Sequence, residues 1–127
     1  MSIIANHKQR ILCVEDHQGT SELITELLEA YAVTAARDLS DGMRLAQSER
    51  FDLYLCDYHL PEGTGLELCE LIRTFDEETP VLLCSVLDSV TEQAVLAAGG
   101  QGFLKKGLGF SGKLEGALRR LLPAVAA

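Results

Sequence analysis

The 127-residue chain is predicted to fold as one α/β domain, a five-stranded parallel sheet with helices on both faces. Two patterns support this fold. Short apolar runs alternate with longer amphipathic segments along the whole chain. The runs around 11–14, 53–56 and 81–84 are apolar at successive positions, as expected for strands covered on both faces.

Five segments are predicted to be strands, and each is followed by a segment with helical features. The strand candidates are RILCVE (10–15), YAVTAA (31–36), FDLYLC (51–56), PVLLCSV (80–86) and GFLKK (102–106). Because strands and helices alternate strictly, without an internal repeat, every connection is a crossover between parallel strands.

The helices are predicted from apolar spacing and from capping patterns. Residues 23–31 place Leu or Ile side chains four positions apart. The patterns TGLE (64–67) and SVTE (89–92) fit the capping box, in which a Ser or Thr precedes a Glu by three positions. A last apolar stripe over 114–122 is stopped by Pro123.

Charge and cysteine content exclude several classes of protein. Eleven basic and nineteen acidic residues give a net charge of −8, which argues against binding to nucleic acid or to an anionic membrane. The four cysteines show no CxxC pattern, so we expect buried, unpaired thiols rather than a zinc or redox site. No run approaches the ~18 apolar residues of a membrane span, and we expect a cytoplasmic location.

Polar residues end four of the five predicted strands. The first strand ends in Glu15 and Asp16, the third in Asp57, the fourth in Ser85 and the fifth in Lys106. The carboxyl ends of parallel strands share one edge of the sheet, where ligands bind in open α/β folds. We therefore expect three carboxylates, a hydroxyl and an ammonium group in one cleft.

Three carboxylates in one cleft need a counter-charge. Each pair at about 4 Å costs on the order of 4 kcal/mol at an effective dielectric near 20. Lys106 offsets part of this repulsion, and Mg²⁺ suits the remaining oxygen ligands better than zinc or calcium. A carboxylate beside Mg²⁺ and a lysine is equipped to accept a phosphoryl group, with Asp57 as the nucleophile.

The motifs VED (14–16), DYHLPEGTG (57–65), CS (84–85) and GFLKK (102–106) resemble the receiver domain of bacterial two-component response regulators. The resemblance covers nearly all of residues 1–127, with 123–127 as a tail or linker. It implies a doubly wound, flavodoxin-like sheet with the strand order 2-1-3-4-5. It also implies a signalling module that catalyses only its own phosphorylation and dephosphorylation.

The resemblance assigns roles to individual residues. Asp57 would be the phosphoryl acceptor, and Mg²⁺ would be held by Glu15, Asp16, Asp57 and the backbone carbonyl of His59. Ser85 would hydrogen-bond the phosphoryl group, and Phe103 would turn inward with it as a switch. The family's pattern aromatic–aliphatic–x–Lys identifies Lys106, not Lys105, as the lysine of the site.

The chain departs from the family pattern at three positions. Gly107 replaces the usual proline after the lysine, and we expect a trans bond or a reshaped loop there. Val86 replaces a small residue and is expected to narrow access to the phosphate pocket. Phe103 lacks the hydroxyl of the commoner tyrosine. These departures bear on rates and remove no catalytic group.

The resemblance implies a histidine kinase or phosphotransfer protein as donor, and a downstream protein or output domain outside this chain. We expect no direct contact with nucleic acid or membrane, and a monomer or weak homodimer.

The alternative is a pseudo-receiver that binds proteins without being phosphorylated. An aspartyl-phosphate hydrolase is disfavoured because His59 stands where such enzymes carry a second acid. GLGFSGK (107–113) matches a P-loop in part, but Leu114 replaces the required Ser or Thr.

Overall fold

The main sheet of the computed structural model, which describes residues 8–87 and 89–123, has five strands. Every neighbouring pair is parallel, and Asp57 lies at the end of the central strand. Counted as five strands along the chain, the order is the predicted 2-1-3-4-5. Across the sheet the strands are β2 (Ala32–Ala36), β1 (Arg10–Val14), β3 (Leu53–Asp57), β6 (Val81–Ser85) and β7 (Gly102–Lys105).

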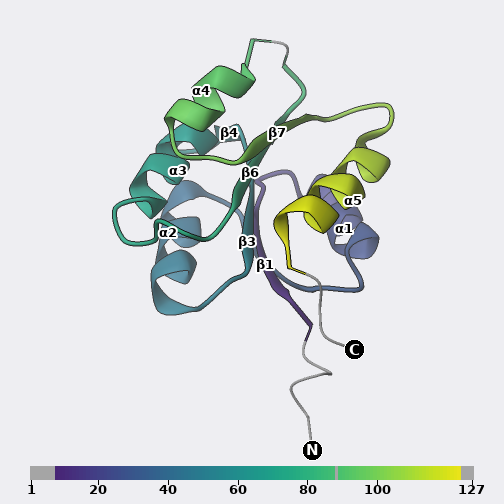
Figure 1. Ribbon diagram of the computed structural model, residues 1–127, viewed down its shortest axis with the longest axis horizontal. Helices are drawn as coiled ribbons and strands as arrows, with labels where there is room; N and C mark the ends of the chain where they lie inside the picture. Colours follow the sequence, from purple (N-terminus) through teal and green to yellow (C-terminus); the bar gives the residue numbers. More distant parts are fainter. Residues whose placement is uncertain (1–7, 88, 124–127) are drawn as a thin grey trace, which may run out of the picture.

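Helices cover both faces of this sheet, as predicted. Figure 1 shows helices packed on either side of the sheet. The first face carries α1 (Gln18–Leu27) and α5 (Phe110–Leu121). The second carries α2 (Leu39–Ser48), α3 (Gly65–Ile72) and α4 (Glu92–Ala97).

The two faces make two hydrophobic cores that share the central strands. In β3, Leu53 and Leu55 belong to the core under α1 and α5, whereas Tyr54 and Cys56 belong to the other core. All five residues of β3 and of β6 are buried. Successive side chains of a strand point to opposite faces, so both faces require apolar residues. This explains the continuous apolar runs.

The helix starts agree with the sequence in one case and differ in another. The Thr64 hydroxyl caps α3 by accepting a hydrogen bond from the Glu67 amide, as predicted. The prediction that Ser89 caps the next helix is wrong, because α4 begins at Glu92 and its cap is Thr91. The Thr91 hydroxyl accepts from the Ala94 amide, and the preceding Val90 is buried.

Two further segments differ from what the alternation of strands and helices and the spacing of apolar residues predict. The loop before α3 contains a short antiparallel hairpin, β4 (His59–Leu60) with β5 (Gly63–Thr64). Ile24 in α1 and Leu28 at its C-cap face the core, but Leu23 is 54% exposed. The segment GLGFSGK forms a loop and the first turn of α5, which begins at Phe110, as expected for a chain without a P-loop.

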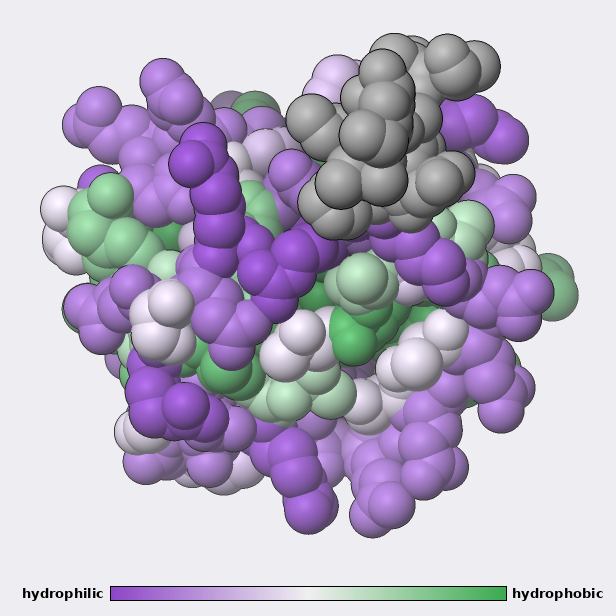
Figure 2. Space-filling model, turned by 90° about the horizontal axis from the view of Figure 1, so that it is seen from below, coloured by the Kyte–Doolittle hydropathy of each residue, from purple (hydrophilic) through white to green (hydrophobic). Residues whose placement is uncertain are grey.

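The lower end of the molecule, where the strands begin, differs from the edge where they end. Figure 2 looks onto this lower end and shows a mainly hydrophilic surface with hydrophobic side chains in its middle. A shallow cavity of about 290 Å³ at the starts of β3 and β6 includes Tyr54, whose hydroxyl donates to Asp76. Within residues 8–87 and 89–123, no helix has both the length and the apolar character needed to cross a membrane.

Candidate functional site

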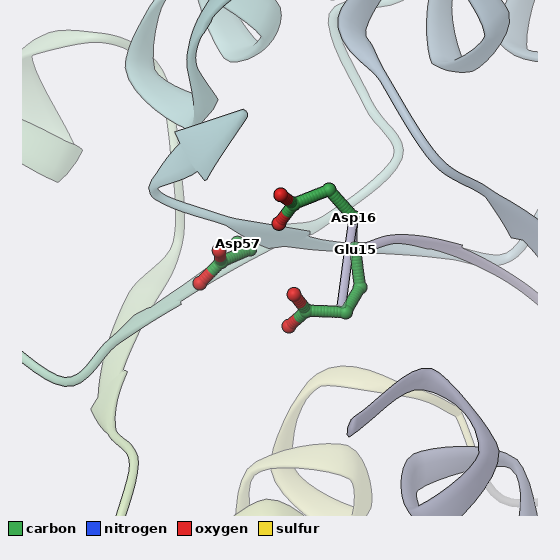
Figure 3. Close-up of side chains that lie close together, drawn as sticks. All are labelled: Glu15, Asp16 and Asp57. Carbon is green, nitrogen blue, oxygen red and sulfur yellow. The ribbon is translucent and has the colours of Figure 1, made fainter. Parts of the chain in front are cut away.

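Three carboxylates meet at the carboxyl edge of the sheet. Glu15 and Asp16 follow β1, and Asp57 is the last residue of the adjacent strand β3. Each offers a carboxylate oxygen, and these oxygens all lie within 4.8 Å of one another. Figure 3 shows the three side chains turned toward a common space. Parallel pairing of β1 with β3 thus brings together residues about forty positions apart.

The three carboxylates differ in burial. Glu15 is 2% exposed and Asp57 is 8% exposed, whereas Asp16 is exposed to solvent. Two negative charges are therefore largely removed from water, which is unfavourable unless they are paired. Asp16 remains open to a ligand arriving from solution.

Lys106 pairs with both buried carboxylates. Its Nζ lies 2.5 Å from Oε1 of Glu15 and 2.9 Å from Oδ1 of Asp57, and its side chain is 15% exposed. Burial alone would lower the pKa of Lys106. Hydrogen bonds to Glu15 and Asp57 outweigh burial, so the pKa of Lys106 lies above its ordinary value. The lysine is therefore charged throughout the physiological pH range.

Strand pairing places Lys106 at the site. Its amide donates to the carbonyl of Ser85 at 2.8 Å, directly after β7 pairs with β6. Ser85 itself is buried at the end of β6, one residue beyond Cys84, the register partner of Asp57. The Ser85 hydroxyl accepts a hydrogen bond from the Leu87 amide at 3.0 Å. This bond ties the hydroxyl to the loop that leads into α4.

Phe103 and His59, whose roles come from the family resemblance alone, lie in strands β7 and β4. Phe103, in β7, is half-buried and packs against the core under α2, α3 and α4. His59, in β4, is exposed, and its ring meets the Tyr58 ring edge-on at 5.0 Å. The switch role of Phe103 and the metal-binding role of the His59 carbonyl stay predictions.

Sequence reasoning missed two residues that shape the site. Gly65 approaches the end of β3 so closely that a Cβ there would lie 2.5 Å from the carbonyl oxygen of Asp57. His17 caps α1 by accepting the Thr20 amide, and its own amide donates to Glu15 at 3.2 Å. The sequence could have pointed to Gly65, because this residue follows the predicted cap Thr64. It gave no such indication for His17, because histidine is an uncommon capping residue.

Two of the positions that depart from the family pattern, Val86 and Gly107, line a groove together with Lys106. Among the described residues there is no cis peptide bond, in agreement with the trans bond expected before Gly107. Gly107 has a φ of 129°, which favours glycine. Val86 is 64% exposed and lines a groove of about 560 Å³ between α1 and the loop after β7. Its effect on access to Asp57 stays a prediction.

The donor set fits a divalent cation. Three carboxylates and one ammonium leave two negative charges at the site, and all the free ligand atoms are oxygens. Oxygen ligands in small number, with one carboxylate open to solvent, match the preference of Mg²⁺. Glu15, Asp16 and Asp57 are the residues that would hold it.

Residues 11–116 match the family model described as the response regulator receiver domain, and the chain therefore belongs to this family. Among the curated relatives, the response regulator MprA of Mycolicibacterium vanbaalenii is 32% identical over 120 residues. The match covers 90% of this chain and 52% of that protein. The chain thus spans about half the length of the curated relatives that it matches.

Solved structures show the same fold. The chemotaxis response regulator CheY4 of Vibrio cholerae has a TM-score of 0.83 and 28% identity, covering 91% of this chain and 99% of that one. The response regulator TrrA of Thermotoga maritima, solved with Mg²⁺ and BeF, has a TM-score of 0.82 and 24% identity, covering 90% and 99%. The flavodoxin-like fold predicted from the sequence is confirmed, and the chain is a receiver domain of two-component signalling.

Proposed function

We propose that this receiver domain accepts a phosphoryl group on Asp57 in a Mg²⁺-dependent reaction. The observation that carries the proposal is the arrangement of Asp57 between Lys106 and the acidic pair Glu15 and Asp16. Membership of the response regulator receiver family supports the same role, because receiver domains are signalling modules of two-component systems.

In the proposed reaction, a carboxylate oxygen of Asp57 attacks the phosphorus atom of the donor, and the bond from phosphorus to the donor breaks. Lys106, which stays protonated, would shift one of its hydrogen bonds to the phosphoryl group. The Ser85 hydroxyl would exchange the Leu87 amide for a phosphoryl oxygen. Bound Mg²⁺ supplies positive charge for the transferring oxygens.

The donor is proposed to be a histidine kinase or a phosphotransfer protein. Support comes from the apolar groove beside the site, which Lys106 lines together with Leu23, Val86 and Phe110. Leu108, in the same groove, is fully exposed between two glycines with positive φ. An apolar surface of this kind next to an acceptor suits a protein donor, whose side chains can fill it.

The output is proposed to follow from Ser85 and Phe103. Loss of the Ser85 bond to Leu87 would free the loop before α4, and Phe103 would move with it. The receiving partner would be a downstream protein or an output domain outside residues 1–127. We also propose a cytoplasmic location, which the four free, buried cysteines support.

The test is to incubate the protein with acetyl phosphate and Mg²⁺ and to measure its intact mass. We expect the gain of one phosphoryl group, and no gain for Asp57→Asn or after EDTA is added. The acceptor role is contradicted if Asp57→Asn gains as much mass as the wild type.

The second candidate is a pseudo-receiver that binds partners without phosphorylation. Val86 and Gly107, which replace the usual residues around the phosphate pocket, favour it. A chain that gains no phosphoryl group and is not stabilised against heat by Mg²⁺ would be a pseudo-receiver. Stabilisation by Mg²⁺ without rapid phosphorylation would instead indicate a slow receiver.

A further inference from the structure

The turn between β2 and α2 borders the acidic site. Arg37 follows β2, and Asp38 is the N-cap residue of α2. Both line a shallow cavity of about 360 Å³ together with Pro61 and with Asp16, the exposed member of the acidic cluster. Pairing of Ala36 with Val14 brings this turn beside Glu15 and Asp16. Arg37 and Asp38 therefore share a cavity with the exposed carboxylate of the acidic cluster.

Arg37 is unpaired in this position. Its side chain is exposed and forms no hydrogen bond or ion pair with any residue in 8–87 or 89–123. Arg44, on the neighbouring helix, instead pairs with Asp41 at 2.6 Å. Asp38 is held in place, because its Oδ1 accepts the Asp41 amide at 2.7 Å. The turn thus presents one free cation and one fixed carboxylate.

The net charge at the site determines how strongly Arg37 and Asp38 affect the binding of an anion. Two net negative charges remain among the three carboxylates and Lys106, and a divalent cation would balance them. Arg37 and Asp38 are then the next charges lining the cavity that Asp16 opens into. The chain as a whole, at −8, repels an anionic donor.

We propose that Arg37 attracts the anionic phosphoryl donor to the site, and that Asp38 opposes this attraction. The inference rests on the proposed function, since it concerns how the donor of the Asp57 phosphoryl group is recognised. The donor class is a phosphorylated group with at least one free oxyanion, because Arg37 recognises charge and leaves the rest of the donor uncontacted.

Substitutions of the two residues should act in opposite directions. Arg37→Met removes the cation and should weaken anion binding about threefold or more at low salt. Asp38→Asn removes the opposing charge and should strengthen it, while the asparagine oxygen still caps α2. A role in folding alone would not produce opposite signs. Arg44→Met, in the helix α2 that follows the turn, is the control and should leave binding unchanged.

The probe is inorganic phosphate, titrated with Mg²⁺ present and followed by phosphorus NMR. We expect the affinities to rank Asp38→Asn, wild type, Arg37→Met, and to converge at about 0.5 M salt, where exposed charges are screened. The proposal is overturned if Arg37→Met binds phosphate as the wild type does, if both variants shift in one direction, or if the wild type binds none.

The same samples distinguish this proposal from the proposed function. Intact mass after acetyl phosphate reports on Asp57, whereas phosphate binding reports on Arg37. A wild type that binds phosphate through Arg37 but gains no phosphoryl group would refute the acceptor role alone. Equal phosphorylation rates for the wild type and Arg37→Met at low salt would refute the steering role alone.

Discussion

Lys106 connects the stability of the domain to its chemistry. It contacts Glu15 and Asp57, which are both buried, so removing it leaves two carboxylates without this partner. Breaking a buried ion pair in this way costs about 3–5 kcal/mol. We expect Lys106→Met to lower the free energy of unfolding by about 3 kcal/mol without metal, and Mg²⁺ to restore most of the loss.

The measurement is urea unfolding of Lys106→Met with Mg²⁺ and with EDTA. Lys113→Met, an exposed position on α5, serves as the control and should change stability little. An equal loss for Lys106→Met with and without Mg²⁺ would show that the metal does not bind at these carboxylates.

The raised pKa of Lys106 fixes how this contribution depends on pH. A lysine whose folded-state pKa is raised contributes its full stability below the unfolded value of about 10.4 and loses it as pH rises further. We expect the difference in unfolding free energy between wild type and Lys106→Met to be constant between about pH 7 and 9. It should shrink above about pH 10.5. A decline already at neutral pH would contradict the pairing.

At the scale of elements, the junction of β3 with α3 depends on Gly65. A Cβ at this position would lie 2.4 Å from Cδ2 of Leu83 and 2.5 Å from the Asp57 carbonyl oxygen. We expect Gly65→Ala to lower the unfolding free energy by about 2 kcal/mol, since overpacking forces backbone shifts. Because the shift falls on Asp57, phosphorylation should slow as well.

Gly116 provides the matched control for this prediction. It lies within α5, and a Cβ there meets no atom within 4 Å. Gly116→Ala should therefore stabilise the domain by about 0.5–1 kcal/mol through helix propensity. Thermal unfolding of both variants checks the pair. Equal effects of the two substitutions would contradict the close approach at Gly65.

Prediction of the elements from the sequence succeeded where one physical rule dominates. The buried strands were predictable because both faces of β3 and β6 are covered, so the only polar residues in them are Asp57 and Ser85, at their carboxyl ends. The hairpin of β4 and β5 was not, because two-residue strands are too short for any periodicity. The start of α4 was misplaced because both Ser89 and Thr91 are suitable caps, and the burial of Val90 decides between them.

The site followed from topology more than from individual residues. Parallel strands share a carboxyl edge, so the sequence predicted that Glu15, Asp16, Asp57 and Lys106 would meet there. The same rule places Arg37 at this edge, since it directly follows the second predicted strand (31–36), but it does not place Arg37 beside Asp16. Its relation to Asp16 depends on the path of the turn after β2, which no local pattern encodes.

At the scale of the whole molecule, one sheet holds two cores together. Cys13 and Cys84 lie in the core under α1 and α5, and Cys56 and Cys69 lie in the other. All four are free and buried, and burial raises the pKa of Cys13 to about 12. The native thiols should therefore be un-ionised and inaccessible at about pH 8, below the ordinary thiol pKa.

We expect all four thiols to react with a thiol-specific reagent in one transition, at the urea concentration where helical circular dichroism is lost. A shared sheet gives a single cooperative unit, as is usual for domains of this size. Reaction of Cys13 and Cys84 before Cys56 and Cys69 would show that the two cores unfold separately.

Asp57 is the residue on which the proposed signalling role depends. The direct measurement is to treat the protein with acetyl phosphate and Mg²⁺, reduce it with borohydride, and sequence its peptides by mass spectrometry. Borohydride converts an aspartyl phosphate to homoserine and leaves unmodified aspartate unchanged. We expect homoserine at position 57 and aspartate at position 16. Homoserine at another position, or at none although Mg²⁺ binds, would contradict the role of Asp57 as phosphoryl acceptor.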